Sequence, residues 1–359
     1  MKRTPKSGES SRHEAAGWGG AFRVAIIGAG SLKGKELKDV LADRNFPSAD
    51  IKLLDDEETL GQVEAVGDEP TFIQSVLPEH LEQVDFTFFA ADEPYTAKTW
   101  HMAKDAGSDI IDLSYALEKE PGIALRAPWI ERQFGQEPKV GLESTPVVIA
   151  HPAAVVLALL IARAQQASAI RHVNATIFEP ASEHGKRGMD ELHDQTVNLL
   201  SFQQMPMTVF GAQVAFNLVG AYGEESKPTI ADVETRIAEH LQKITAGRIP
   251  VPSLMLLQAP VFHAHTFSIY IELDSALSVE DFQRALSGEH VEITRPLDNA
   301  PSNVNVAGQT QVQVSVKRDT VRENGFWIWA ASDNLKISAT LAVECAEEML
   351  ATRPRGTVQ

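Results

Sequence analysis

A glycine-rich stretch, Gly28-Ala-Gly-Ser-Leu-Lys-Gly34, contains the residue types that can hold a phosphate group. It follows the apolar run 22–27 and precedes a helical pattern over 35–43, which is the context that a dinucleotide-binding loop requires. Gly28 would form the tight turn, Gly30 would let the backbone approach a pyrophosphate, and Gly34 would let helix and strand pack closely. The spacing G-x-G-x-x-x-G differs by one residue from the common dinucleotide-binding fingerprint G-x-G-x-x-G. The stretch therefore predicts either a nucleotide site or a purely structural turn.

Four carboxylates, Asp55-Asp-Glu-Glu58, follow the next apolar run, 51–54. An acidic residue near the end of the second strand can accept a hydrogen bond from a ribose 2′-hydroxyl, whereas a 2′-phosphate requires an arginine. If a dinucleotide binds, we therefore expect NAD rather than NADP, with Asp55 and Asp56 nearest to the ribose. A solvated acidic loop is the alternative interpretation.

A second strand-to-helix turn lies at His151-Pro152, between the apolar runs 147–150 and 153–161. Proline is favoured at the first helical position because it lacks the N–H that would be unpaired there. The free N–H groups and partial positive charge of such a helix N-terminus could hold an oxyanion or lower the pKa of a thiol. The turn offers only alanine and valine, Ala154 among them, so it carries no nucleophile.

Histidines and the lone cysteine are the remaining residues with chemical potential. His263 and His265 alternate along the predicted strand 262–273 and should share one face, although their spacing is no metal motif. Cys345, the single cysteine of the chain, falls on the apolar face of the predicted helix 335–351, which indicates a core residue. One cysteine cannot form an internal disulfide, so a reducing, cytoplasmic location is expected.

The 359 residues carry a formal net charge of −17, which argues against nucleic acid and anionic membrane as partners. The longest apolar stretch, 152–162, is too short for a membrane span, which needs roughly 20 residues. No apolar core of a signal peptide is present in the polar segment 1–20.

The order of the predicted elements indicates an α/β protein with two domains. Strands and helices alternate up to residue 113, which predicts a parallel, doubly wound sheet with Ala90 and Ala91 at the carboxyl end of one strand. Further along, long strands and helices predict a mixed, largely antiparallel α+β half, with a hairpin at Asn324-Gly325. We expect a disordered tail (1–21), a Rossmann-like domain (22–151), an α+β domain (152–334) and a C-terminal helix returning to the first domain (335–359).

Several motifs resemble one known family when they are taken together and in order. They are Val24-Ala-Ile-Ile-Gly28, Leu41-Ala-Asp-Arg-Asn-Phe-Pro47, Lys186-Arg-Gly-Met-Asp-Glu-Leu192, Pro260-Val-Phe-His-Ala-His265 and Asp333-Asn-Leu335. Over residues 22–351 the chain is similar to the aspartate-semialdehyde dehydrogenase family. The resemblance implies a Rossmann-like domain that binds NAD(P), and a second domain that forms the interface of a homodimer or homotetramer.

Members of this family reduce an acyl phosphate with NADPH through a cysteine thioester. A glutamine orients the cysteine, a histidine acts as acid and base, and arginines hold the carboxylate and the phosphate of the substrate. In this chain the nucleophile position falls on Ala154, the glutamine on Glu179, the carboxylate arginine on Gln258 and the phosphate arginine on Glu118. The histidine is kept as His265.

The cofactor positions implied by the resemblance are partly kept. They are Gly28, Gly30, Ser31, Leu32, Lys33, Gly34, Asp55, Asp56, Ala90, Ala91 and Asn334. The serine and arginine that serve the 2′-phosphate fall on Asp56 and Glu58, and a flexible Gly-Ala-Gly falls on Glu183-His-Gly185.

These replacements predict a protein that does not reduce aspartyl phosphate, because no thiol is present and Glu118 would repel a phosphate. It resembles the non-catalytic paralogues of the family, which favours a nucleotide-binding pseudoenzyme. The alternatives are another acyl-phosphate reductase, which would also need the cysteine, and a divergent oxidoreductase or acid/base enzyme that uses Glu179 and His265. A metal on His151, His184 and His265 is a further, less favoured form of the last alternative.

Overall fold

The computed structural model describes residues 22–66, 69–136, 145–295 and 300–352. The tail predicted for residues 1–21 lies outside this part of the chain. In the described residues, no helix combines the length and the apolar composition that a membrane crossing requires.

The first layered unit is built on a seven-stranded sheet in which every neighbouring pair is parallel, in the order β5-β2-β1-β6-β7-β9-β8. Its strands are β1 (Phe22–Ile27), β2 (Ser48–Asp55), β5 (Gln74–Ser75), β6 (Phe86–Phe89), β7 (Asp109–Asp112), β8 (Ala124–Arg126) and β9 (Val147–Ile149). A small hairpin, β3 (Val63–Val66) and β4 (Glu69–Phe72), lies at one side. This is the Rossmann-like arrangement that the alternation of strands and helices predicts.

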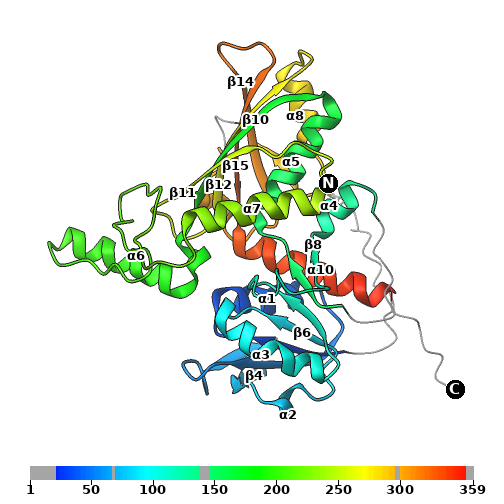
Figure 1. The fold of residues 1–359 in the computed structure, drawn as a ribbon, viewed down its shortest axis with the longest axis vertical. Helices are drawn as coiled ribbons and strands as arrows, with labels where there is room; N and C mark the ends of the chain where they lie inside the picture. Colours follow the sequence, from blue (N-terminus) through cyan, green and yellow to red (C-terminus); the bar gives the residue numbers. More distant parts are fainter. Residues whose placement is uncertain (1–21, 67–68, 137–144, 296–299, 353–359) are drawn as a thin grey trace, which may run out of the picture.

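Helices cover both faces of this sheet because consecutive residues of its central strands are apolar and buried. Val24 and Ile26 of β1 share a core with α1 (Leu32–Asp43), while Ala25 and Ile27 share another with α3 (Glu93–Asp105). The short helices α2 (Pro78–Leu81) and α4 (Pro128–Gln133) complete the unit. The first unit lies below the second in the view of Figure 1. Open α/β sheets bind ligands at the carboxyl ends of their strands.

The second unit contains a mixed six-stranded sheet in the order β11-β10-β12-β15-β14-β13, with three antiparallel and two parallel pairs. Its strands are β10 (Ile170–Glu179), β11 (Ser253–Gln258), β12 (His265–Leu273), β13 (Val291–Ile293), β14 (Val312–Arg318) and β15 (Gly325–Ser332). The hairpin expected at Asn324-Gly325 is present, because β14 and β15 pair across that turn.

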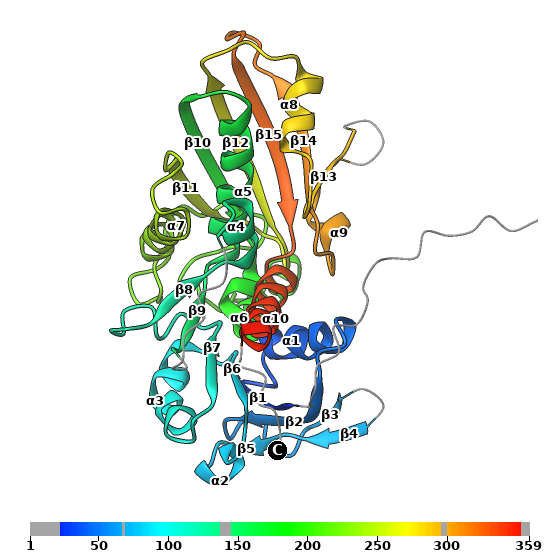
Figure 2. The ribbon, with the colours of Figure 1, turned by 90° about the vertical axis from the view of Figure 1, so that its right-hand side faces the viewer.

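The longer helices of the described residues cover one face of the mixed sheet (Figure 2), and on the other face the short α9 (Asn303–Val306) packs Val306 against Ala331 of β15. The covering helices are α5 (Pro152–Ala167), α7 (Ile230–Thr245) and α8 (Val279–Leu286), which share a core with the inward residues of the strands. The 3₁₀ turn η1 (Ala181–His184) and helix α6 (Gly185–Leu200) project to one side. The last helix, α10 (Asn334–Thr352), returns to the first unit and packs against α1.

One predicted strand begins later than expected. The segment 262–264 is not part of β12, because Ala264 adopts a left-handed conformation with φ of 72° and its N–H donates to the Asn334 side chain. His263 therefore does not alternate with His265 along one strand, and the prediction of a shared face was wrong. The backbone of 261–262 instead accepts hydrogen bonds from η1.

Candidate functional site

The glycine-rich loop joins β1 to α1 at the carboxyl edge of the parallel sheet. Gly28 has φ of +87°, and a Cβ there would lie 2.6 Å from the carbonyl carbon of Ala90 and even closer to Ala91. A Cβ at Gly34 would overlap the carbonyl oxygen of Gly28. Both glycines are therefore required by close backbone approach, and Ala90 and Ala91 lie directly against the loop.

Two side chains of the loop fix its position. Ser31 caps α1, since its Oγ accepts from the Gly34 N–H at 2.9 Å and donates to the Ala90 carbonyl at 2.8 Å. Lys33 donates to the Leu113 carbonyl at 3.0 Å, and its ammonium lies 4.7 Å from the ring centre of Tyr115. Leu32, the first residue of α1, is half-buried.

Asp55 ends β2 and closes the loop from the other side. Its carboxylate accepts from the Gly30 N–H at 2.7 Å and from the Asp56 N–H at 2.9 Å, and burial raises the pKa of this carboxyl. A Cβ at Gly30 would meet Thr59, 2.7 Å away. A helix N-terminus beside an acidic strand end fits the pyrophosphate and ribose of a dinucleotide, for which the Asp55 oxygens keep unused lone pairs.

The second turn places Ala154 in the first turn of α5, fully buried. His151 caps this helix, with its Nδ1 accepting from the Ala153 N–H at 3.2 Å, and its own N–H donates to Nδ1 of His240 at 3.0 Å. A backbone N–H can only donate, so Nδ1 of each ring carries no proton. Burial also lowers the pKa of His151 well below its ordinary value.

A central polar cluster, defined as Tyr115, His151, Glu183, His265 and Asn334, lies between the two sheets. The rings of Tyr115 and His151 stack at 5.6 Å, and His151 and His265 lie 5.8 Å apart, centre to centre. His265 Nε2 lies 3.8 Å from Glu183 Oε1, which accepts from the Asn334 amide at 2.9 Å. The resemblance implied His265 and Asn334 as site residues, and the structure brings them together around Glu183.

Glu183 is the charged member of this cluster. Burial alone would raise its pKa, but His151, His265 and Lys33 together with the Asn334 amide bring the pKa down to about 2. Glu183 is therefore a carboxylate at neutral pH.

A second group, the Glu179 group, consists of Glu179, His184, Tyr222 and Gln258. The Tyr222 hydroxyl donates to Gln258 Oε1 at 2.8 Å and lies 2.9 Å from His184 Nε2. Both hydrogens of the Gln258 amide are used, because its nitrogen donates to the carbonyls of Glu179 and Ala259. Gln258 is fully buried and has no free donor for a ligand carboxylate.

Glu118 is not the isolated negative charge that the sequence suggests. Arg236 of α7 donates to both of its oxygens, at 2.9 and 3.2 Å, and His240 Nε2 lies 3.3 Å from it. These partners lower the pKa of Glu118 to about 2, although burial alone would raise it. Arg236 also pairs with Glu93 of α3 at 2.7 Å. Because Arg236 is shared between Glu118 and Glu93, it offsets only part of their charge, and the repulsion of a phosphate by Glu118 stays a prediction.

The proposed metal cluster does not form. In the described residues, no three histidine, cysteine or carboxylate side chains are arranged to hold a metal ion. His184 belongs to the Glu179 group, apart from the contact between His151 and His265.

Four residues of the site are not evident as such in the sequence: Tyr115, Glu183, Tyr222 and Arg236. In the sequence, Glu183 is noticeable only because it occupies the first position of the family's flexible Gly-Ala-Gly segment. Arg236 could have been singled out because it is the only arginine within the segment that forms α7. Tyr115 and Tyr222 lie in irregular segments where no periodicity points to burial.

Each of the two units matches a model of a known protein family. The model described as "Semialdehyde dehydrogenase, NAD binding domain" matches residues 23–167, and the one described as "Semialdehyde dehydrogenase, dimerisation domain" matches residues 161–337.

Individual relatives match along nearly the whole chain. An aspartate-semialdehyde dehydrogenase from Rickettsia bellii is 31% identical over 337 residues, which covers 92% of this chain and 98% of the relative. A USG-1 protein homolog from Azotobacter vinelandii is 29% identical with the same coverage. The structure of a probable aspartate-semialdehyde dehydrogenase from Pseudomonas aeruginosa superposes with a TM-score of 0.80 at 26% identity, covering 92% of this chain and 98% of that one. The chain belongs to the aspartate-semialdehyde dehydrogenase family.

Proposed function

We propose that this protein keeps the dinucleotide-binding scaffold of its family but does not carry out the reduction of an acyl phosphate through a thioester. The observation that carries the proposal is Ala154, a methyl group at the helix N-terminus where the family pattern has its cysteine. Thioacyl chemistry needs a thiolate both as nucleophile and as leaving group, and a methyl group is neither.

Cys345 cannot replace the missing thiol. It is the only cysteine in the sequence, it is fully buried within α10, and burial raises its pKa to about 12. A buried thiol with a raised pKa is a poor nucleophile. Its burial and the absence of a second cysteine also fit our proposal of a cytoplasmic location.

The anion-binding positions support the same conclusion. Gln258 uses its amide within the protein, and Arg236, the nearest guanidinium to Glu118, already binds two carboxylates. A dianionic phosphate at this place would have to compete with Glu93 and Glu118 for Arg236. The residues present do not favour an acyl phosphate as ligand.

We propose NAD rather than NADP as the dinucleotide. Asp55 lies at the end of β2 beside Gly30, and Asp56 follows it, so a 2′-phosphate would meet carboxylates. When bound, the nicotinamide group would supply hydride transfer; Asp55 would hold the ribose, and the first turn of α1 would hold the pyrophosphate.

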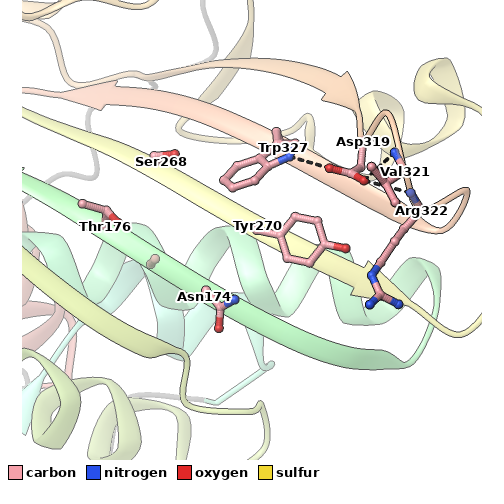
Figure 3. A pocket seen from close by; sticks show the side chains of 9 residues that line it. Asn174, Thr176, Ser268, Tyr270, Asp319, Val321, Arg322 and Trp327 are labelled. Atoms are coloured by element: carbon pink, nitrogen blue, oxygen red, sulfur yellow. Dashed lines mark hydrogen bonds between the residues drawn. The ribbon is translucent and has the colours of Figure 1, made fainter.

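We propose a homodimer, or a tetramer built from it, with the largely uncovered face of the mixed sheet as the interface. This face presents Trp327 and Trp329, which are 37% and 38% exposed. It also holds a pocket of about 390 Å³ beside Tyr270 and Arg322 (Figure 3). Sedimentation of the full chain tests this assembly: a dimeric or tetrameric mass supports it, and a monomer at micromolar concentration contradicts it.

An acid/base enzyme is the second candidate, and the closeness of Glu183 to His265 favours it. Here Glu183, whose Oε1 lies 3.8 Å from His265 Nε2, takes the acid/base role that the sequence suggested for Glu179. Proton abstraction from a carbonyl compound would then need no thiol.

The test of the main proposal is a pair of measurements on the full chain. Titration calorimetry with NAD and with NADP should show binding that favours NAD. The same preparation should show no reduction of either dinucleotide with aspartate semialdehyde and phosphate. Binding of NADP in preference to NAD would refute the cofactor assignment, and turnover would refute the loss of activity.

A further inference from the structure

Four polar residues form a row across the end of the mixed sheet. Gln258 on β11 pairs with Glu179 on β10, and His265 on β12 pairs with Ser332 on β15. On the antiparallel strands β10 and β12, Phe178 pairs with Thr266. The next residues of the two strands in that direction are Glu179 and His265, so these two are neighbours as well. All four side chains are on the helix-covered face and are at most 1% exposed.

Three members of the row have polar atoms without a partner. Within the described residues, Glu179 Oε2, both ring nitrogens of His265 and Ser332 Oγ are buried and make no hydrogen bond. Buried polar groups in folded proteins nearly always have partners, so several unpartnered atoms along one row indicate a place for a polar ligand.

Glu179 has the greatest need of a partner. Its other oxygen, Oε1, has only long contacts, 3.4 Å to the Tyr222 hydroxyl and 3.5 Å to His184 Nε2. A buried carboxylate is stable only when cations or several donors surround it. The charged groups nearest to this region are already engaged: Glu183 faces His265, and Arg236 binds Glu93 and Glu118.

The missing partner of Glu179 indicates which kind of ligand would bind at this row. Glu183 lies 3.8 Å from His265, whereas no cation of the described residues pairs with Glu179 Oε2. Gln258, its other neighbour in the row, has no free amide hydrogen. An ammonium group supplies both a positive charge and several N–H donors, which are the two things that Glu179 lacks.

We propose that Glu179 receives the ammonium group of a small primary amine, with Ser332 and His265 as further polar contacts. The side chains of Glu183 and His184 keep 7% and 8% exposure, against 1% for Glu179, so we place the entry of the ligand on their side. This site does not depend on a dinucleotide, and it uses the position where the family pattern has a neutral glutamine.

Methylammonium is the simplest probe. Thermal unfolding of the full chain is followed with methylammonium chloride, with tetramethylammonium chloride, which has no N–H donor, and with sodium acetate, all at constant ionic strength. We expect only methylammonium to raise the unfolding temperature. An equal rise with tetramethylammonium, a rise with acetate alone, or no rise with methylammonium would overturn the proposal.

The decisive variant is Glu179→Gln, which introduces the family's own side chain and should fold. We expect it to bind methylammonium roughly tenfold to hundredfold more weakly, the effect of losing one charged hydrogen-bond partner. Glu280→Gln, on the exposed start of α8, is the matched control and should bind like the wild type. Unchanged binding by Glu179→Gln would show that the amine binds elsewhere.

Discussion

At Ala154 the helix N-terminus of the family pattern is present without a thiol. The helix N-terminus around it is intact: Pro152 starts α5, His151 caps it, and the Val155 N–H donates to the His151 carbonyl. The local electrostatics that would lower a thiol's pKa are thus still present. At this turn the sulfur atom is missing, and no other residue of the central polar cluster can form a thioester.

Restoring the thiol alone should not restore the reaction. In Ala154→Cys we expect a reactive cysteine, because the helix N-terminus stabilises the thiolate, but no turnover with aspartate semialdehyde, phosphate and either dinucleotide. The reason is that Gln258 and Arg236 remain bound to protein groups and cannot hold the substrate.

The measurement is the absorbance of reduced nicotinamide, with thiol titration to show that the introduced sulfur is accessible. Ala153→Cys, one residue earlier in the helix, is the matched control. Substantial turnover by Ala154→Cys alone would mean that the anion-binding positions matter less than we infer.

The charge of Glu183 should appear in the pH dependence of stability. The pKa of Glu183 is lowered from 4.5 to about 2 in the folded protein. Its contribution to the free energy of unfolding is therefore fully present above pH 4.5 and is lost as the pH falls toward 2. The shift corresponds to at most about 3 kcal/mol. Glu183→Gln should therefore lose less unfolding free energy than the wild type between pH 5 and pH 3.

Urea unfolding at several pH values measures this difference. Glu118 has a similarly lowered pKa, so Glu183→Gln should flatten the profile only in part. Glu57→Gln, on the exposed acidic loop, should follow the wild-type profile. Identical pH profiles for Glu183→Gln and wild type would show that Glu183 is not held as a charged group.

For single residues, the sequence predicted which family positions are replaced. It did not predict which side chains the replacing residues contact. The partner of Glu118 is 118 residues away in Arg236, and Glu183 lies 82 residues before His265. Such contacts depend on how the two sheets meet, which no local pattern encodes. The resemblance located Ala154, Glu179 and Gln258 in the chain because motif order survives substitution of single residues.

Among the elements, the loop between β1 and α1 is the most constrained by backbone geometry. A Cβ at Gly34 would overlap the Gly28 carbonyl and would lie 2.9 Å from Ala29 Cα. Gly34→Ala should therefore push α1 away from β1 and destabilise the protein by about 1–3 kcal/mol.

The urea midpoint measures this cost. Gly220→Ala is the control, since a Cβ there would make an ordinary contact of 3.6 Å with Leu257. If Gly34→Ala were as stable as Gly220→Ala, the close packing of α1 on β1 would not be required.

Element boundaries differ from the sequence predictions where a side chain changes the backbone. Helix α1 begins at Leu32, three residues before its predicted start, because Ser31 caps it. Strand β12 begins at His265 because Asn334 binds the Ala264 N–H and interrupts the strand. A capping serine is visible in the sequence, whereas the contact with Asn334 is not.

For the molecule as a whole, Arg236 connects the two layered units. It extends from α7 in the second unit to Glu93 and Glu118 in the first, and it lies 4.9 Å from the Tyr115 ring centre. Arg236→Met would leave Glu118 largely buried without its main partner. Breaking a buried pair from one side costs about 3–5 kcal/mol, so we expect a loss toward the lower end of that range.

Arg284→Met is the matched control because Arg284 and Asp281 form an exposed pair on one helix. Its unfolding free energy should stay within about 0.5 kcal/mol of the wild-type value. Equal stability of the two variants would show that Arg236 does not join the units.

The overall fold was predictable because many weak signals agree. Alternating strands and helices indicate the parallel sheet, and the family motifs occur in the right order over residues 22–351. The largely uncovered face of the mixed sheet was not predicted from periodicity. Its outward residues, such as Tyr270 and Trp327, are aromatic, so they resemble core positions in the sequence.

The wild-type protein should lack thioester chemistry, because no thiol is present at the position of Ala154. The measurement is the oxidation of aspartate semialdehyde with phosphate and NAD or NADP by the full chain, beside the Rickettsia bellii relative under identical conditions. We predict a rate at least roughly 10⁴-fold below that of the relative, as expected when a nucleophile is absent. A rate within tenfold of that of the relative would show that the wild-type protein carries out the family reaction.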